Sequence, residues 1–301
     1  MRNHTIFGLF SFLFIIIVIG SYVIVAQGPI TGTWTANTRD EKGGKLNINF
    51  ERRVGGEGRH QVGESFDYSD LEGLSAAQTQ NGKVSFRLVR EAGTVQCEGA
   101  FTNGSGSGTF TFTPNQGFID AMRSRGFDFE KSTSKRGDSD VSDRLFTAAA
   151  VNVTTALADD LLSANFGKLD VDDLFKAAIF KIDGKFMAEM KATGFPNLGM
   201  EELVKARIFK IDADYVRQVH EMGFENQDFE GLVKFRIFKV TPEFLGELKN
   251  EGFTNLSPED IVKFRIFNID TDFIRKAKDE DPNVTVEQMV QMKIGVRRRG
   301  V

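Results

Sequence analysis

The sequence predicts an α+β protein in which a small antiparallel β-sheet or partial barrel is followed by a solenoid-like stack of about six short helix pairs. Three observations support this prediction. Residues 30–112 alternate between apolar and polar side chains, as strands with one buried face do. Beyond them, a block of 29 residues recurs in register. Phenylalanine is in excess, with 29 Phe against 3 Tyr and 1 Trp, which indicates one apolar packing arrangement used repeatedly.

The composition excludes several classes of protein. With 38 Lys and Arg against 42 Asp and Glu, the net charge is −4, so no general attraction to nucleic acid is expected. The single Cys97 excludes an intrachain disulfide and a cysteine-based zinc site, and three histidines leave little for a metal centre or a triad. No G-x-S-x-G, Walker or H-E-x-x-H pattern occurs. We therefore expect neither a cofactor nor an enzymatic activity.

Residues 1–27 are predicted to direct the chain out of the cytoplasm. The 21 residues Ile6–Ala26 carry no charge, and Arg2 precedes them. Two interpretations stay open: a signal peptide cleaved after Ala26, or an uncleaved membrane anchor, since about 20 apolar residues can span a bilayer. Both place the remaining chain in the periplasm or at the cell surface, because the positive N-terminus is retained in the cytoplasm. Membrane contact is expected only through residues 6–26, if they are uncleaved.

Residues 28–113 are predicted to form the antiparallel β module. Short turns separate the apolar-polar segments, which favours a meander. The glycine spacing of Gly104–Gly108 is that of a phosphate loop, but a strand follows instead of a helix, so we expect a hairpin turn there. Five or six strands are expected, and the five identified segments are Thr31–Thr38, Lys45–Arg52, Lys83–Arg90, Thr94–Phe101 and Gly108–Thr113.

The start of the first strand, Gly32-Thr33-Trp34, resembles the G-x-W signature of lipocalin-like barrels. That resemblance implies an alternative function, the carriage of a small apolar ligand inside the β module. Lipocalins enclose their ligand with eight strands, more than this segment offers. We therefore expect a partial barrel whose interior is filled by side chains.

Residues 114–296 are predicted to be tandem 29-residue repeats, followed by a basic tail at 297–301. A polar stretch, Ser132–Asp143, interrupts the repeats and is expected to be a loop. Because a pair of short helices cannot bury its own apolar side, neighbouring units are expected to stack. The aligned blocks are LFTAAAVNV from Leu145, LFKAAIFKI from Leu174, LVKARIFKI from Leu203, LVKFRIFKV from Leu232, IVKFRIFNI from Ile261 and the degenerate MVQMKIGV from Met289.

Each unit is predicted to contain two short helices. The first begins at a capping residue: Asp183, Asp212, Thr241 or Asp270. It ends at a Gly-Phe pair, where the glycine adopts a left-handed conformation and the phenylalanine packs back on the helix. The second helix begins at a capped acidic or amide-bearing turn (Asp170, Ser257 or Thr285) and carries an apolar stripe through Leu203, Val204, Ile208 and Ile211. The Gly-Phe pairs are Gly194-Phe195, Gly223-Phe224 and Gly252-Phe253.

Stacking of the units would align basic residues from one repeat position into a ladder. Such a ladder could bind an acidic peptide or polyanion. Alternatively, its members pair with acidic residues of adjacent helices. Phe209, Phe238 and Phe267 are expected to be core residues instead of exposed anchors. The candidate partner-binding residues are Lys205, Arg207, Lys234, Arg236, Lys263 and Arg265.

The L-V-K-x-R-I-F-K-I and Gly-Phe units resemble repeats of uncharacterised exported bacterial proteins, some of which are joined to membrane metallopeptidases of the beta-lactam-sensing type. The stretches Arg90–Thr94 and Gly108–Phe112 are similar to the segment before those repeats. The resemblance implies export and a shared architecture, but no activity, since no peptidase motif is present. We therefore expect a non-catalytic interaction or scaffold protein that binds a protein or peptide of the cell envelope through its helical repeats.

Overall fold

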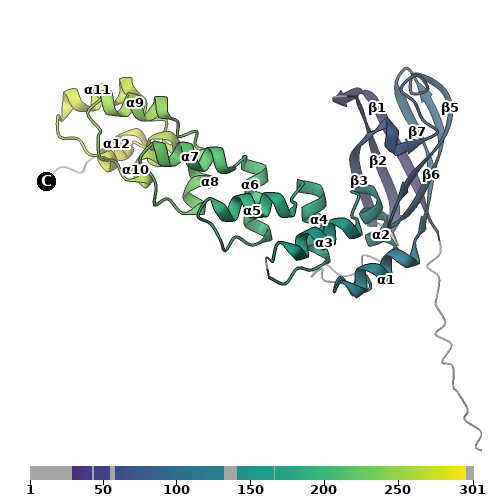
Figure 1. Ribbon diagram of the computed structural model, residues 1–301. Coiled ribbons are helices and arrows are strands. Elements are labelled where there is room, and N and C mark those ends of the chain that lie inside the picture. Colours follow the sequence, from purple (N-terminus) through teal and green to yellow (C-terminus); the bar gives the residue numbers. More distant parts are fainter. Residues whose placement is uncertain (1–28, 43, 55–57, 132–140, 166, 296–301) are drawn as a thin grey trace, which may run out of the picture.

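The computed structural model describes residues 29–42, 44–54, 58–131, 141–165 and 167–295. Within them, a curled antiparallel sheet is followed by twelve helices that extend away from it as an elongated stack (Figure 1). This arrangement confirms the predicted α+β fold class. The apolar run 6–26, most of the predicted loop 132–143 and the basic tail lie outside the described residues.

The sheet has seven strands, more than the five or six that were expected. Strand β3 was missed because its sequence, GRHQVGESFD, places only Val62 and Phe66 on the apolar face. Strand β4 is too short to show a pattern. The strands are β1 Ile30–Lys42, β2 Lys45–Val54, β3 Gly58–Asp67, β4 Leu71–Glu72, β5 Asn81–Arg90, β6 Gly93–Thr102 and β7 Ser105–Pro114.

Two meanders make up the sheet, joined by pairing between the first and the last strand. The strand order is β3-β2-β1-β7-β6-β5-β4, and β1 pairs with β7 so that Thr33 lies opposite Thr109. The two ends of this order, β3 and β4, do not pair with each other, which leaves a half-barrel. The hairpin predicted at Gly104–Gly108 is present, but its turn is only Asn103-Gly104, since β7 already begins at Ser105.

Aromatic side chains fill the interior of the half-barrel, as expected from the number of strands. The Trp34 ring lies 5.3 Å from that of Phe86, and its indole nitrogen donates to the Glu98 carbonyl at 3.2 Å. A Cβ at Gly99 would come within 2.7 Å of the Trp34 ring, so only glycine fits opposite the indole. The fully buried aromatic residues of the sheet are Trp34, Phe50, Phe86, Phe101, Phe110 and Phe112.

The second helix of the first repeat, α2 (Val141–Ala150), packs against the sheet. Phe146 stacks on Phe110, with ring centroids 4.9 Å apart, and also contacts Phe50 and Phe112. Beside it, the buried Asp143 pairs with Arg52 of β2. The predicted LFTAAAVNV copy is therefore helical, but its apolar face serves as part of the core of the half-barrel.

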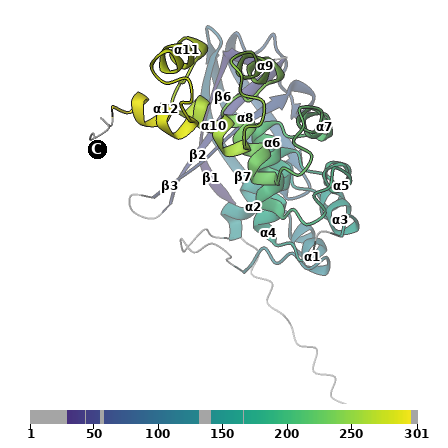
Figure 2. The same ribbon diagram turned by 90° about the vertical axis from the view of Figure 1, so that its left-hand side faces the viewer.

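The remaining helices form a two-layer stack, and Figure 2 shows the layers as two rows. Within one layer, α4 contacts α6, α6 contacts α8, α8 contacts α10 and α10 contacts α12. The first-helix layer comprises α1 Gln116–Ser124, α3 Thr155–Ser163, α5 Gly184–Ala192, α7 Ala213–Glu221, α9 Pro242–Asn250 and α11 Thr271–Glu280. The second-helix layer comprises α4 Val171–Phe180, α6 Met200–Phe209, α8 Phe229–Ile237, α10 Pro258–Ile266 and α12 Val286–Lys293.

The helices of the stack are short. None of the described helices by itself has the length and apolar composition to cross a membrane. Only α2 and α3 together meet that criterion, and the chain bends by 84° between them.

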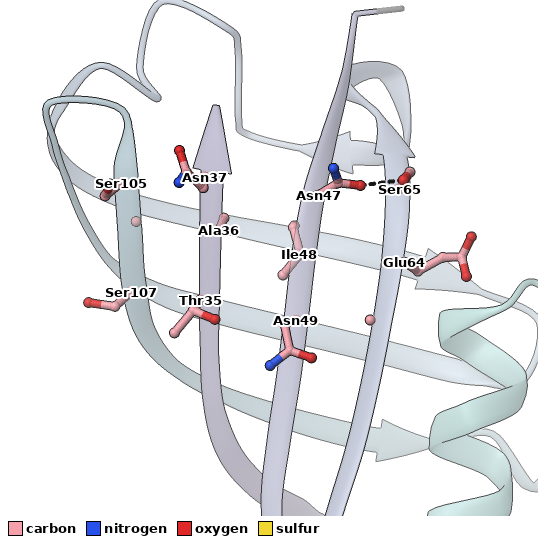
Figure 3. A pocket seen from close by; sticks show the side chains of 12 residues that line it. Thr35, Ala36, Asn37, Asn47, Ile48, Asn49, Glu64, Ser65, Ser105 and Ser107 are labelled. Atoms are coloured by element: carbon pink, nitrogen blue, oxygen red, sulfur yellow. Dashed lines mark hydrogen bonds between the residues drawn. The ribbon is translucent and has the colours of Figure 1, made fainter. Parts of the chain in front are cut away.

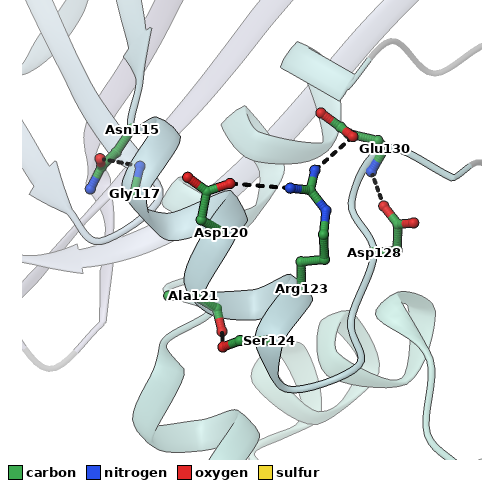
Figure 4. A network of polar contacts seen from close by, with 8 residues as sticks. All are labelled: Asn115, Gly117, Asp120, Ala121, Arg123, Ser124, Asp128 and Glu130. Carbon is green, nitrogen blue, oxygen red and sulfur yellow. Dashed lines mark hydrogen bonds and ion pairs between the residues drawn. The ribbon is translucent and has the colours of Figure 1, made fainter. Parts of the chain in front are cut away.

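Polar contacts cap α1 and connect it to the segment that follows it (Figure 4). Asn115, directly after β7, caps α1 by accepting a hydrogen bond from the Gly117 backbone at 3.0 Å. Arg123 binds Asp120 at 3.1 Å and Glu130 at 2.6 Å, which connects α1 to the segment that follows it. Glu91 accepts a hydrogen bond from the Thr155 backbone at 2.9 Å, so the turn between β5 and β6 contacts the start of α3. The β module thus shares polar contacts with α2, through Arg52 and Asp143, and with α3, through Glu91 and Thr155.

The predicted starts and stops of the first helices are confirmed. Asp183 caps α5 by accepting from the Phe186 backbone at 2.7 Å, and Asp212, Thr241 and Asp270 do the same for their helices. Gly194, Gly223 and Gly252 have φ values of 98°, 94° and 87°. The Phe224 and Phe253 backbones donate to Val219 and Leu248, which completes the Schellman arrangement.

Five second helices, from α2 to α10, end differently, at a left-handed residue that is not glycine, whereas α12 is followed by the left-handed Gly295. Lys210 has a φ of 53°, and the following Ile211 backbone donates to the Ala206 carbonyl at 2.8 Å. A left-handed conformation brings Cβ close to the next carbonyl, which costs about 1–2 kcal/mol. The equivalent left-handed residues are Asn152, Lys181, Lys239 and Asn268.

Lys210→Gly is therefore expected to raise the free energy of unfolding, by about 0.5–1 kcal/mol. Glycine removes the Cβ strain of the folded state, and the greater conformational entropy of glycine in the unfolded chain offsets part of that gain. Urea unfolding followed by circular dichroism at 222 nm measures the change. Lys276→Gly is the matched control: Lys276 is an exposed residue inside α11, where the same substitution should destabilise by about 1 kcal/mol. If both substitutions lowered the free energy of unfolding, the backbone at Lys210 would not be strained.

Candidate interaction surface of the helical repeats

The arginines of the predicted ladder contact the protein itself. The Arg207 guanidinium lies 3.7 Å above the Phe186 ring, and Arg236 lies 3.9 Å above Tyr215. Arg265 repeats this contact on Phe244 at 3.7 Å. Each arginine thus stacks on an aromatic residue of the preceding first helix.

Two of these arginines, Arg207 and Arg236, also bind the ends of preceding second helices. Arg236 donates to the carbonyls of Phe209 at 3.0 Å and Lys210 at 2.7 Å, and Arg207 donates to the Lys181 carbonyl at 2.6 Å. Carbonyls at a helix end lack intrahelical donors and lie at the negative end of the helix dipole. Each of these two arginines therefore joins three consecutive helices, which is a structural role that the sequence analysis did not consider.

The second repeat, α3 and α4, lacks both the arginine and the aromatic residue of this contact. Helix α4 has Ala178 where the later units have arginine, and α3 has Leu157 where they have an aromatic residue. At the other end, Lys293 lies 4.6 Å above Phe273 and replaces the arginine. The arginine and the aromatic residue are both absent from one repeat and both present in the next three, so the sequence already contained a signal for the contact.

The lysines of the ladder pair mostly with acidic residues of the next second helix. Lys205 binds Glu230 at 2.6 Å, and this hydrogen bond raises the lysine pKa. Lys263 binds Asp260 at 3.2 Å and Glu287 at 3.3 Å, and these two bonds likewise raise its pKa. These two lysines therefore pair with acidic residues of adjacent helices, which was the alternative to partner binding.

Lys234 differs from the other lysines of the ladder. Within the described residues it makes no ion pair. The position three residues before it is Gly231, where the other units have an acidic residue or glutamine: Asp173, Glu202, Asp260 and Gln288. Beside Lys234, a pocket of about 490 Å³ opens between α8 and α10.

A row of exposed isoleucines follows the second-helix layer, one from each helix or its end. We name Ile179, Ile208, Ile237, Ile266 and Ile294 the isoleucine row; their exposed fractions are 46–55%. The prediction that Ile208 belongs to the buried stripe was wrong. The left-handed turn at Lys210 folds the chain back so that Ile211, which is fully buried, occupies the core at the end of the helix.

The phenylalanines next to this row are neither fully buried core residues nor fully exposed anchors. Phe209, Phe238 and Phe267 are half-buried and pack against the core, whereas we had expected core residues. Each leaves part of its ring beside an exposed isoleucine. The second-helix layer therefore carries exposed apolar side chains at one repeat position, with lysines nearby in the sequence.

A groove of the β module lies on the face of the sheet that carries Thr35 and Asn49. It has a volume of about 680 Å³ and is bordered by Thr35, Asn37, Asn47, Asn49 and Ser107 (Figure 3). Its lining is mostly polar and uncharged, while the interior of the half-barrel is filled by aromatic rings. The lining of this groove therefore does not resemble the enclosed apolar cavity that a carrier of a small apolar ligand needs.

The described residues also show how the one thiol is placed. Cys97 is fully buried in β6, and desolvation raises its pKa well above the usual range, so the thiol stays protonated. Among the described residues, no group of three or more His, Cys, Asp or Glu side chains is placed to hold a metal ion.

A scan of the sequence against protein-family models gives no match, and comparisons with curated proteins and with solved structures find none either.

Proposed function

We propose that the chain is a non-catalytic scaffold that binds a protein or peptide of the cell envelope through its second-helix layer. The isoleucine row is the observation that carries this proposal. Single exposed apolar residues are normal on protein surfaces. In the isoleucine row, one repeat position is apolar and exposed in α4, α6, α8 and α10 and at the end of α12. Apolar residues that recur in this way can form a contiguous surface, and such surfaces are typical of interaction sites.

The spacing of the row supports an elongated partner. Packed helices lie about 8–10 Å apart, so the isoleucines of adjacent second helices recur at about that distance. An extended chain advances about 10 Å in three residues. A peptide segment lying across the helices can therefore contact several repeats in turn, as in other stacked-repeat proteins with extended binding surfaces.

Export to the envelope is part of the proposal and is supported by the sequence. The uncharged run at 6–26 has the composition of a signal peptide or an anchor. The resemblance of the repeat blocks to those of exported bacterial proteins points in the same direction.

Site-specific photocrosslinking tests the proposed surface. A photoreactive amino acid replaces Ile208 or Ile237 in the full-length chain, expressed in its native cells. Lys185, whose side chain is 84% exposed on α5 in the other layer, is the matched control position. We expect a discrete crosslinked partner from 208 and 237, identified by mass spectrometry, and none from 185. Adducts that form equally from 185, or none from the isoleucine row, would refute the proposal.

A further inference from the structure

We infer that the pocket between α8 and α10 is the anchor point of the surface, and that it binds an acidic peptide segment. One aliphatic side chain of the peptide enters the pocket, and an adjacent carboxylate binds Lys234. This inference rests on the proposed function and specifies the chemistry of the partner.

The fourth repeat, α7 and α8, has Gly231 in place of the acidic residue of α4 and α10, and the Gln227 side chain occupies the space where a Cβ would lie. In α4 and α10, the acidic residue in the first turn binds the lysine three residues later: Asp173 binds Lys176 at 3.4 Å and Asp260 binds Lys263 at 3.2 Å. In α8 that position is Gly231, which lines the pocket. Lys234 is therefore left without its intrahelical partner.

The contact between neighbouring second helices is also missing at this place. Lys176, Lys205 and Lys263 each bind a glutamate of the following helix (Glu201, Glu230 and Glu287, respectively) at 2.6–3.3 Å. The corresponding residue for Lys234 is Glu259, and no ion pair joins the two. Lys234 and Glu259 both border the pocket, on opposite helices. An incoming carboxylate can thus bind Lys234 without displacing a protein partner.

The charge around the pocket favours an acidic ligand. The four aligned blocks from Leu174 to Ile269 contain ten lysine or arginine residues and no acidic residue. Lys210 and Lys239 are exposed beside the isoleucine row and make no ion pair within the described part of the chain. Two acidic residues border the pocket: Asp228 is engaged as the cap of α8, accepting from the Gly231 backbone at 2.7 Å, and Glu259 lies on α10.

The apolar part of the pocket fits an aliphatic side chain. The buried Phe235 and the half-buried Phe238 come from α8 and its end, and Val262 and Ile266 come from α10. Ile266 is also a member of the isoleucine row, so the pocket opens directly onto the proposed binding surface. A peptide anchored here is positioned to continue along the neighbouring repeats.

The test uses a fluorescently labelled, acetylated and amidated peptide of five Leu-Glu-Glu units, titrated with the full chain and followed by fluorescence anisotropy. Two matched peptides replace every leucine by serine or every glutamate by lysine. We expect saturable binding of the Leu-Glu-Glu peptide, and at least tenfold weaker binding of both matched peptides. Affinity should also fall as salt concentration rises.

Variants of the protein locate the site. Lys234→Gln and Ile266→Ser are expected to weaken binding of the Leu-Glu-Glu peptide at least tenfold. Two controls should change it less than twofold: Lys205→Gln, where the lysine is paired with Glu230, and Leu162→Ser, an exposed apolar residue of α3 in the first-helix layer. Thermal unfolding of each variant checks that the stack is intact.

The outcomes separate this inference from the proposed function. Equal binding of the lysine peptide, or equal effects of Lys234→Gln and Lys205→Gln, would overturn the acidic specificity and the anchor point. Crosslinking from positions 208 and 237 would then still support a scaffold. Absence of saturable binding by the Leu-Glu-Glu peptide would likewise overturn the inference, while loss of the position-specific crosslinks would refute the proposed function itself.

Discussion

Phe146→Ala is expected to lower the free energy of unfolding of the β module by about 3–5 kcal/mol, the range for removing a large buried aromatic side chain. Phe146 is the residue of α2 that contacts Phe50, Phe110 and Phe112 together. Its removal leaves a cavity between helix and sheet that the rigid strands cannot close. The lower stability should therefore be detected in the unfolding of the sheet, although the substitution is in a helix.

The single tryptophan makes this prediction directly measurable. Trp34 lies in the core of the sheet, so its fluorescence during urea unfolding reports the β module. Phe267→Ala is the matched control, because Phe267 is only half-buried and lies at the far end of the stack. We expect it to leave the Trp34 transition unchanged. A Phe146→Ala transition that coincides with the wild-type transition would show that α2 does not support the sheet.

Arg236→Ala is expected to have the second largest effect, a loss of about 2–3 kcal/mol of coupling between repeats. The substitution removes the stacking on Tyr215 and two hydrogen bonds to helix-terminal carbonyls. Because each repeat is stabilised by its neighbours, weaker coupling should separate the unfolding of α7–α12 from that of the preceding helices. Circular dichroism at 222 nm should then show a broader urea transition.

Two further substitutions identify which property of the arginine matters. Arg236→Lys keeps the charge but loses the planar fork, and we expect it to recover only part of the coupling. Lys205→Gln removes an exposed ion pair with Glu230 and should leave the transition unchanged. If Lys205→Gln broadened the transition as much as Arg236→Ala, surface charge and not the stacked arginine would couple the repeats.

Much of the helical architecture could be predicted from the sequence because its determinants are local. The caps at Asp183 and Ser257 and the left-handed glycine at Gly223 each depend on residues within one turn of the helix end. The 29-residue period then required stacking, since one unit exposes too much apolar surface alone. The strand β3 was missed for the opposite reason: its place in the sheet depends on pairing with β2, not on its own weak alternation.

The candidate site was only partly predictable. The sequence located the basic positions Lys205, Arg207 and Lys234, but their roles depend on what lies opposite each of them in the stack. Tertiary contacts engage Arg207 with Phe186 and Lys205 with Glu230, whereas Lys234, beside Gly231, forms no ion pair with any residue that the structure describes. Exposure of Ile208 likewise depends on Ile211 occupying the core at the end of the same helix.

The sequence by itself therefore determined the two-part organisation, the repeat period and the helix boundaries, because these follow from local backbone preferences and from periodic apolar patterns. Tertiary structure alone decided that α2 completes the core of the half-barrel, which charges are neutralised and which apolar side chains stay at the surface. These features depend on contacts between residues in different elements, many of them about 25 positions or more apart in the chain. Side-chain type does not specify the partner in such contacts; the packing of the elements does.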